Sequence, residues 1–462
     1  MPPQVLYLAY RKTQSLWSKV GLLLVLSPVL VFPNFWPLLT AVSLSLLLLL
    51  FFLRPLKPSP FNGVWLAWWL MVLVAVLVTA DPDLTLPKFT GLILGFAWWV
   101  YLSRAINGRS SLILAFIFWG LLGMGFAVIG VLSATWLFKV PGISAILQAL
   151  PSQILQLPGS DSGVQPNQLA GTLLLYLPFL VSLLLGWRPA AHRRWLLAGT
   201  AVLALITTAL LILTQSRSGW IGAIGGLFVL LVLWGIVLPS MRQRKLIWAG
   251  VGASLLAGIG GLWAFGPQKL QTIWDDPGQL GATAVGNLGS LGFRQEVWRW
   301  GITAVQDFPF TGAGLGAFRH VVRRLYPLNV NPAYDIAHAH NIFLQTALDV
   351  GLPGLIVYLA LLLLAFWLGW QVARGDETLR PFALGLLAGF AALHIYGLTD
   401  ALALGSKTGL SFWVALGLLT AMHQIVRQTA VTQPPPVLPD APTPAPDHPA
   451  PDPAALQPVH PG

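Results

Sequence analysis

Long runs of apolar residues recur along the chain and are separated by short polar connections. A helix that crosses a bilayer needs about 20 predominantly apolar residues. The pattern therefore predicts an all-α polytopic membrane protein with about twelve transmembrane helices. The predicted spans lie at residues 18–33, 35–53, 61–80, 86–103, 111–138, 168–187, 195–214, 218–238, 246–266, 352–373, 381–400 and 408–426.

Two further segments differ from the spans in composition. The stretch 139–167 is rich in Pro, Gly and Ser with some amphipathic character, and we expect it to lie along the outer surface. The C-terminal tail is dominated by Pro and cannot bury a core, so we interpret it as a disordered extension. The predicted organisation is an N-terminal segment at 1–17, spans one to nine within 18–266, one large loop with helical stretches at 267–350, spans ten to twelve within 351–427, and the tail at 428–462.

The composition supports this class and excludes others. Hydrophobic residues make up 56% of the 462 residues and charged residues only 9%, against roughly 25% charged residues in an ordinary globular chain. Basic residues are scattered in small groups between apolar runs and form no continuous stripe, so the sequence predicts no nucleic-acid partner. The chain has no Cys, which excludes thiol catalysis, thiolate metal sites and disulfides.

The distribution of Lys and Arg predicts which side each connection faces. Cytoplasmic loops of membrane proteins are enriched in both residues, and here they occupy the N-terminus and alternate connections. Both termini are therefore predicted to be cytoplasmic and the large loop external. The loops assigned to the cytoplasm carry the whole formal net charge of +11. Their basic residues are Arg11, Lys12, Lys19, Arg54, Lys57, Arg104, Arg109, Arg188, Arg193, Arg194, Arg242, Arg244, Lys245, Arg374, Arg380 and Arg427.

The external loop contains a group of arginines. Arg294 and Trp298 are four residues apart, and Arg319 and Arg323 have the same spacing, so each pair shares one face of a helix. Five arginines within about thirty residues form a candidate anion-binding surface, because the planar guanidinium suits phosphate oxygens. A solvated basic face near lipid headgroups is the alternative.

Arg217 lies in the run TQSRSGW between two apolar spans, with almost no loop to hold it in water. A charge at the edge of the hydrocarbon is costly, so it either snorkels to the interface or serves a polar cavity. Ser216 and Ser218 flank it and add small polar groups that a lipid-facing anchor does not need. These neighbours favour the polar cavity.

His338 and His340 precede a short amphipathic helix that leads to Gly351 and Pro353. A neutral imidazole at this place can take a proton from a hydroxyl near physiological pH. Zinc binding by the His-x-His pair is the alternative, but nothing supplies further ligands at a recognisable spacing. We therefore predict no metal, and for His338 we favour a local hydrogen bond.

Other polar residues rank lower. Asp81-Pro82-Asp83 resembles a metal-binding pair, but the intervening Pro favours a turn. His394 lies in the middle of a span and either lines a cavity or makes a hydrogen-bonded helix contact. Asp400 and Lys407 flank a short outer turn, and we expect them to pair with each other.

Four elements, taken in order, resemble one family. They are the SRSGW element at Arg217, the R-x-x-x-W element at Arg294, the stretch PFTGAGLGAF from Pro309, and His340-Asn341 followed after nine residues by Gly351-x-x-Gly354. In this order, and at these positions relative to the predicted spans, they resemble the O-antigen ligase family, whose C-terminal region is shared with O-antigen polymerases. The resemblance covers residues 200–400 closely.

The resemblance implies a membrane glycosyltransferase of the C-type architecture, metal-independent and without cofactors. Such a ligase takes a glycan from an undecaprenyl pyrophosphate donor and passes it, with inversion, to an acceptor hydroxyl on lipid A core or another envelope acceptor. This would occur at the periplasmic side of the bacterial inner membrane, among membrane lipids. By the same resemblance Arg217 and Arg294 would hold the pyrophosphate, and His340 would be the general base or would position the acceptor. The candidate substrate-binding residues are Arg319, Arg323, His338, Asn341 and Trp298.

Three other functions remain open at this stage. A polymerase that extends a lipid-linked repeat unit needs the same pyrophosphate clamp. An enzyme that attaches teichuronic or capsular polysaccharide differs only in its acceptor. An inorganic-carbon transporter would belong to another class, but a carrier places charges or broken helices near the bilayer midplane, and only His394 is available there.

Overall fold

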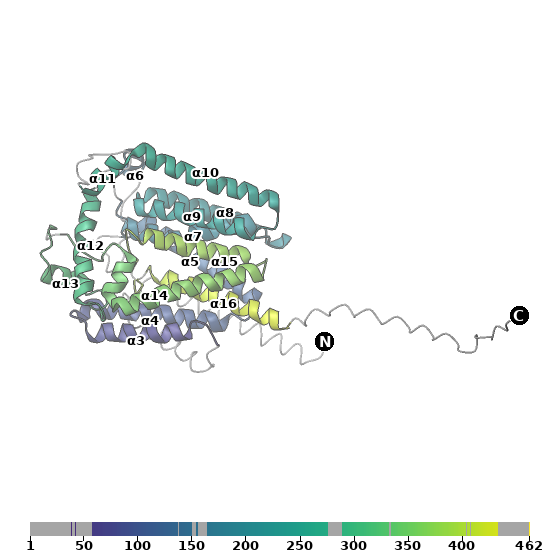
Figure 1. The fold of residues 1–462 in the computed structure, drawn as a ribbon, viewed down its shortest axis with the longest axis horizontal. Helices are drawn as coiled ribbons and strands as arrows, with labels where there is room; N and C mark the ends of the chain where they lie inside the picture. Colours follow the sequence, from purple (N-terminus) through teal and green to yellow (C-terminus); the bar gives the residue numbers. More distant parts are fainter. Residues whose placement is uncertain are drawn as a thin grey trace. The chain divides into compact units, whose positions relative to one another are not determined.

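The computed structural model describes residues 38, 42, 58–136, 138–149, 154–155, 164–275, 289–331, 334–402, 404–406, 408–432 and 462. Helices dominate this part of the chain (Figure 1). The predicted span 18–33, the span 35–53 apart from residues 38 and 42, and most of the tail lie outside it. The helices are α3 (Asn62–Leu77), α4 (Pro82–Ala105), α5 (Arg109–Ser133), α6 (Pro141–Gln148), α7 (Pro166–Gly186), the 3-10 helix η1 (Ala191–Arg193), α8 (Trp195–Leu213), α9 (Arg217–Val237), α10 (Met241–Phe265), α11 (Pro267–Asp275), α12 (Gly289–Asp307), α13 (Phe318–Leu325), α14 (Ile342–Gly375), α15 (Arg380–Tyr396) and α16 (Leu410–Thr432).

The protein is an all-α polytopic membrane protein, as predicted. Seven of the described helices are long and apolar enough to cross a membrane, and α3 and α15 are shorter apolar helices. Every predicted span from 61–80 onward coincides with one helix. The large predicted loop contains α11, α12 and α13 and the first turns of α14. The number of crossings stays a prediction.

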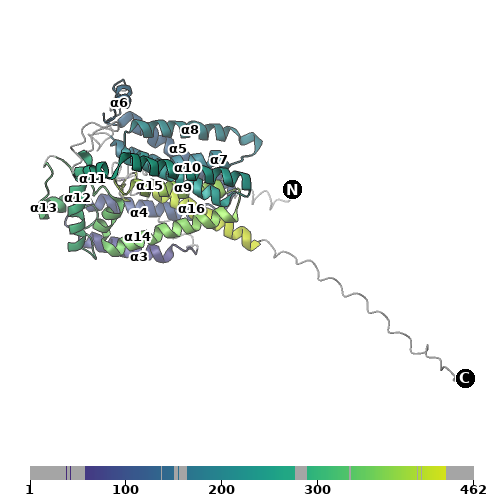
Figure 2. The ribbon, with the colours of Figure 1, turned by 45° about the horizontal axis from the view of Figure 1, so that its top comes forward.

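Helix α15 lies inside the unit that extends to Val426, where it packs against both α7 and α9 (Figure 1, Figure 2). Small residues allow this close approach. A Cβ on Gly389 would lie 2.7 Å from the carbonyl oxygen of Leu175, and one on Gly226 would lie 2.4 Å from the Cβ of Ala392. Backbones that approach through glycine and alanine pack tightly without polar side chains, as is common between membrane helices. The turns at the ends of α9 and α15 are therefore held in fixed positions.

Several helix ends differ from the predicted boundaries, among them the ends of α15 and α16. Helix α15 ends at Tyr396 and not at residue 400, because Gly397 opens a turn in which the Asp400 N–H still bonds the Tyr396 carbonyl. This turn carries Asp400 out of the span. Helix α16 continues to Thr432, past the predicted boundary at 427, since no helix-breaking residue precedes Pro434.

The Gly-rich stretch after α12 is clamped onto a kink in α14. The Ala313 N–H donates to the Leu348 carbonyl at 2.7 Å, and the Leu352 N–H donates to the Pro309 carbonyl at 2.7 Å. Gly351 has φ +74° inside α14, and a Cβ there would lie 2.4 Å from the Phe310 carbonyl oxygen. The two glycine-containing sequence elements therefore contact each other, and together they fix the start of α14.

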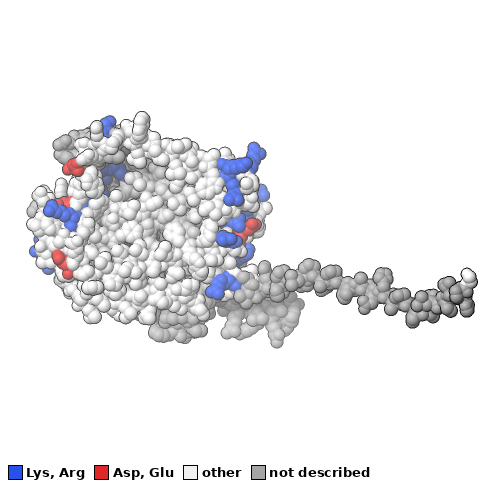
Figure 3. Space-filling model, viewed as in Figure 1, with Lys and Arg blue, Asp and Glu red and all other residues white. Residues whose placement is uncertain are grey.

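Basic side chains gather where the short connections lie. Residues 187–194, 238–240 and 376–379 connect neighbouring helices at one end, where Lys and Arg cluster at the right of Figure 3. The turns at 214–216 and 397–400 lie at the opposite end, together with α12 and α13. The two ends of the bundle thus carry different kinds of loops.

Candidate active site

The segment before α14 is docked onto the turn after α15. Asn341 is the N-cap of α14: its side-chain oxygen accepts from the N–H groups of Phe343 and Leu344, at 3.0 and 2.9 Å. Its amide nitrogen donates to the Leu398 carbonyl at 3.0 Å. The Ile342 N–H donates to the Gly397 carbonyl at 2.7 Å. The loop 338–341 and the turn 397–400 are therefore joined by direct hydrogen bonds into one assembly.

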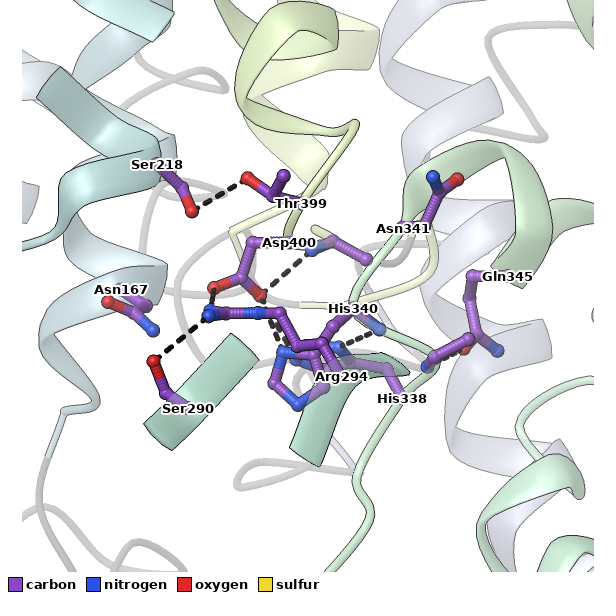
Figure 4. Close-up of polar contacts among 12 residues, drawn as sticks. Asn167, Ser218, Ser290, Arg294, His338, His340, Asn341, Gln345, Thr399 and Asp400 are labelled. Carbon is purple, nitrogen blue, oxygen red and sulfur yellow. Dashed lines mark hydrogen bonds and ion pairs between the residues drawn. The ribbon is translucent and has the colours of Figure 1, made fainter. Parts of the chain in front are cut away.

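Asp400 is the centre of this assembly (Figure 4). One carboxylate oxygen lies 3.2 Å from a terminal nitrogen of Arg294, and the other lies 3.2 Å from Nδ1 of His340. Burial alone would raise the pKa of Asp400, but the hydrogen bond with His340 and the nearby positive charges hold its pKa at about 2. Asp400 is therefore ionised at any physiological pH and links the arginine to the histidine.

The contact with Asp400 sets the tautomer of His340. An ionised carboxylate only accepts hydrogen bonds, so Nδ1 carries the proton and Nε2 presents its lone pair. No described residue bonds Nε2, and the ring is 19% exposed. His340 also has φ +50°, a strained conformation for a non-glycine residue. The Trp298 indole N–H donates a hydrogen bond to the backbone carbonyl of His340 at 3.3 Å. His340 is thus oriented as a base with one open nitrogen.

His338 makes the local hydrogen bond that we favoured from the sequence. Its Nδ1 accepts from the backbone N–H of His340 at 3.2 Å, which leaves Nε2–H directed at Asp400, 3.7 Å away. Burial, together with the adjacent His340, lowers the pKa of His338 to about 3. His338 therefore stays neutral and supports the loop.

Arg217 and Arg294 meet at one hydroxyl. Arg217 is the first residue of α9, and Ser216 caps that helix by accepting from the Gly219 N–H at 3.2 Å. The guanidinium groups of Arg217 and Arg294 both contact the Ser290 hydroxyl, at 2.8 and 3.5 Å. Ser290 and Arg294 are one turn apart on α12, and Trp298 follows one turn later. One face of α12 thus carries contacts to both the arginine pair and the histidine loop.

The other predicted arginines lie outside this cluster. Arg319 forms an ion pair with Asp335 at 2.5 Å, and Arg323 donates to the backbone carbonyls of Asn331 and Tyr334. Both are on α13 and neither contacts Asp400 or the histidines. The arginines of the candidate anion-binding surface therefore do not all meet at Asp400, and the contacts of Arg319 and Arg323 favour a structural role.

Two lower-ranked residues have clear structural contacts. His394 accepts from the Tyr358 hydroxyl at 2.7 Å and donates to the Phe390 carbonyl at 2.6 Å, so it is the hydrogen-bonded helix contact. Asp81 caps α4 at the expected turn and pairs with His320 at 2.5 Å. Lys407 lies outside the described residues, so its expected pairing with Asp400 is not tested.

His338, His340 and Asp400 place potential ligand atoms within 4.8 Å of one another. Arg294 already forms an ion pair with the Asp400 carboxylate, and Arg217 contacts the same Ser290 hydroxyl as Arg294. Two fixed positive charges oppose the binding of a divalent cation and favour an anion. The donor set thus agrees better with an anionic ligand than with a metal.

Sequence reasoning missed Asp400 as a site residue and did not consider Ser290. Asp400 is separated from Arg294 by more than a hundred residues, and no spacing rule connects them. The available signal was an isolated acid at the end of an apolar segment, a position that is costly unless a partner is present.

Comparison with known proteins agrees with these elements. Residues 200–359 match the family model described as O-antigen ligase, a range that includes Arg217, Arg294, His340 and the Gly351 kink. A comparison with curated proteins gives no match. The matched family is one of membrane enzymes that transfer glycans.

Proposed function

Residues 200–359 belong to the O-antigen ligase family, and from this premise we propose that the protein is an inverting membrane glycosyltransferase. It moves a glycan from an undecaprenyl pyrophosphate donor to a hydroxyl of lipid A core or another envelope acceptor. The observation that carries the proposal is the shared carboxylate of Asp400, which joins an anion-binding arginine to an oriented histidine.

Arg217 and Arg294 hold the donor pyrophosphate. Both contact Ser290, so their guanidinium groups converge, and charge-assisted bonds from arginine suit phosphate oxygens. When the bond from the sugar to the phosphate breaks, negative charge develops on the pyrophosphate. Fixed positive groups at that place stabilise the transition state more than the ground state.

His340 acts on the acceptor. Its open Nε2 takes the proton of the acceptor hydroxyl while the hydroxyl oxygen forms a bond to the anomeric carbon. Attack comes from the face opposite the pyrophosphate, so the configuration inverts and undecaprenyl pyrophosphate leaves. Asp400 stabilises the imidazolium that forms, since it accepts from Nδ1 at 3.2 Å. These residues supply the base and the charge stabilisation, and we propose that no metal or cofactor takes part.

The cation-rich connections support the predicted orientation. They lie at the end of the bundle opposite the cluster, as expected if that end faces the cytoplasm. We infer that the protein resides in a bacterial inner membrane with both termini cytoplasmic and the cluster periplasmic. A periplasmic site would meet the lipid-linked glycan and the acceptor on the same side of the membrane.

The proposal is tested by transfer from a lipid-linked glycan to its acceptor in cells that lack the wild-type copy. Arg294→Ala and His340→Ala should each reduce attachment at least about 100-fold, because each removes a transition-state contact. Lys245→Ala, an exposed cation at the opposite end, is the control. Normal attachment by the His340 variant would overturn the assignment.

The null strain separates a ligase from a polymerase. A ligase predicts that lipid-linked polymer accumulates without attachment, whereas a polymerase predicts attached or lipid-linked single repeat units. Transport of inorganic carbon loses its one candidate midplane residue, because both ring nitrogens of His394 are bonded within the helix bundle.

A further inference from the structure

A lysine from a distant part of the sequence is held beside the arginine pair. Lys139 precedes α6, and its backbone N–H donates to the side-chain oxygen of Gln215 at 2.7 Å; the Val140 N–H donates to the same oxygen at 2.6 Å. Gln215 lies two residues before Arg217, in the turn that starts α9. This one side chain therefore holds the backbone of Lys139 against the turn that precedes Arg217.

Gln215 is an unusual residue for a purely structural contact. It is fully buried, and its φ of +50° is a left-handed conformation that few non-glycine residues adopt. Its side-chain nitrogen has no hydrogen-bond partner among the residues that the structure describes. Strain and an unsatisfied buried donor are features that concentrate at ligand-binding sites. Both are found here next to Arg217.

The charges at this place match a particular donor. Lys139 is half-buried, and its ammonium group interacts electrostatically with Arg217, Arg294 and Asp400. Three cations thus face one carboxylate, which leaves an excess of two positive charges while His338 is neutral. A diphosphate linked to a lipid and a sugar carries two negative charges, whereas a monophosphate linked in the same way carries one.

Resting on the proposed function, we propose that Lys139 is a specificity-determining residue that contacts the second phosphate and makes the site select lipid diphosphate sugars over lipid monophosphate sugars. Gln215 positions Lys139 for this contact. Without an anion the ammonium group is unfavourable: burial and the charges of Arg217 and Arg294 lower the pKa of Lys139 to about 8. A bound dianion would offset this repulsion.

The test uses the full-length protein in lipid nanodiscs and two probes with the same short polyprenyl chain and the same sugar, one with a diphosphate and one with a monophosphate. For Lys139→Gln we expect roughly tenfold weaker binding of the diphosphate probe, as for the loss of one charge-assisted hydrogen bond. Binding of the monophosphate probe should stay within about twofold, which also reports that the variant is folded. Lys139→Arg should restore the preference, and Lys245→Gln is the charge-matched control.

The outcomes distinguish this inference from the proposed function. If the wild type binds neither probe, or if Arg294→Gln binds both as the wild type does, the donor assignment itself fails. If Arg294→Gln weakens binding but Lys139→Gln leaves the ratio of the two affinities unchanged, only the role of Lys139 is overturned. An equal loss of affinity for both probes would show that Lys139 attracts any anion, and it would also overturn the proposed selectivity for diphosphate.

Discussion

Two pairs of arginines, at the same end of the bundle, differ in what their charges contact. Arg217 and Arg294 converge on Ser290, and Arg294 shares the carboxylate of Asp400, which is only 2% exposed. Arg319 pairs with Asp335, which is 54% exposed, and Arg323 holds backbone carbonyls. The inner pair is thus partly desolvated and is connected through Asp400 to His340. In the outer pair, Arg319 is neutralised by an exposed carboxylate, and Arg323 donates only to uncharged backbone carbonyls.

This difference in environment makes the inner pair the better candidate for function and the outer pair the better candidate for a structural role. An exposed ion pair contributes about 0–1 kcal/mol and is screened by salt. A buried carboxylate costs several kcal/mol to desolvate and persists only with good partners. Asp400 has three partners, Arg294, His338 and His340, and such an arrangement at the end of membrane helices needs a reason beyond stability. The buried carboxylate of Asp400, more than the number of arginines, therefore marks the candidate site.

The largest difference between the two pairs is expected when the carboxylate partner of each, Asp400 or Asp335, is replaced by an amide. Asp400→Asn removes the charge that sets the His340 tautomer and stabilises the imidazolium, so the rate of glycan transfer should fall on the order of 100-fold or more. Asp335→Asn removes the matching partner of Arg319 and should stay within about twofold. Initial rates with purified protein measure both. Equal rates for the two variants would remove the distinction between the inner and outer pairs.

The sequence predicts features that depend on neighbouring residues, and it does not predict contacts between segments that are far apart in the chain. Span positions follow from length and hydropathy, and they coincide with the helices from α3 to α16. Neighbours on one helix face, such as Arg294 and Trp298, follow from a spacing of four. The pairing of Arg294 with Asp400 depends on how α12 lies against the turn that follows α15, and no local pattern encodes it. The partner of Arg319, Asp335, lies 16 residues away in a non-helical segment, so helical spacing does not predict it.

The second-largest effect is expected at the contact between the Gly-rich stretch after α12 and the kink in α14. Gly351→Ala places a side chain at φ +74° and 2.4 Å from the Phe310 carbonyl, which should destabilise the protein on the order of 2 kcal/mol. Gly63→Ala in α3 is the control, because nothing lies within 4 Å of its Cβ position. Thermal unfolding in nanodiscs compares them. An unchanged melting temperature for Gly351→Ala would show that the clamp is not needed.

The third effect is the pH dependence of donor binding, which depends on Lys139 beside the inner pair. Since the pKa of Lys139 is lowered to about 8, its ammonium is protonated and attractive to the donor below that pH and loses its charge above it. The affinity for a lipid diphosphate sugar should therefore fall roughly tenfold between pH 7 and pH 9.5, and Lys139→Arg should abolish the decline because arginine stays charged. Binding isotherms across this range provide the measurement. A decline that persists in Lys139→Arg would assign the titration to another group.

The smallest effect is expected at the outer pair itself. In the double variant Arg319→Gln and Arg323→Gln, the carbonyls of Asn331 and Tyr334 lose a charged donor, so amide exchange in residues 334–336 should accelerate. Transfer should change by less than about threefold, since neither side chain reaches Asp400 or His340. Hydrogen exchange and steady-state kinetics on the same preparation measure the two effects. A tenfold rise in KM for the acceptor, with kcat retained, would instead show that α13 binds substrate, as the spacing of these arginines alone had predicted.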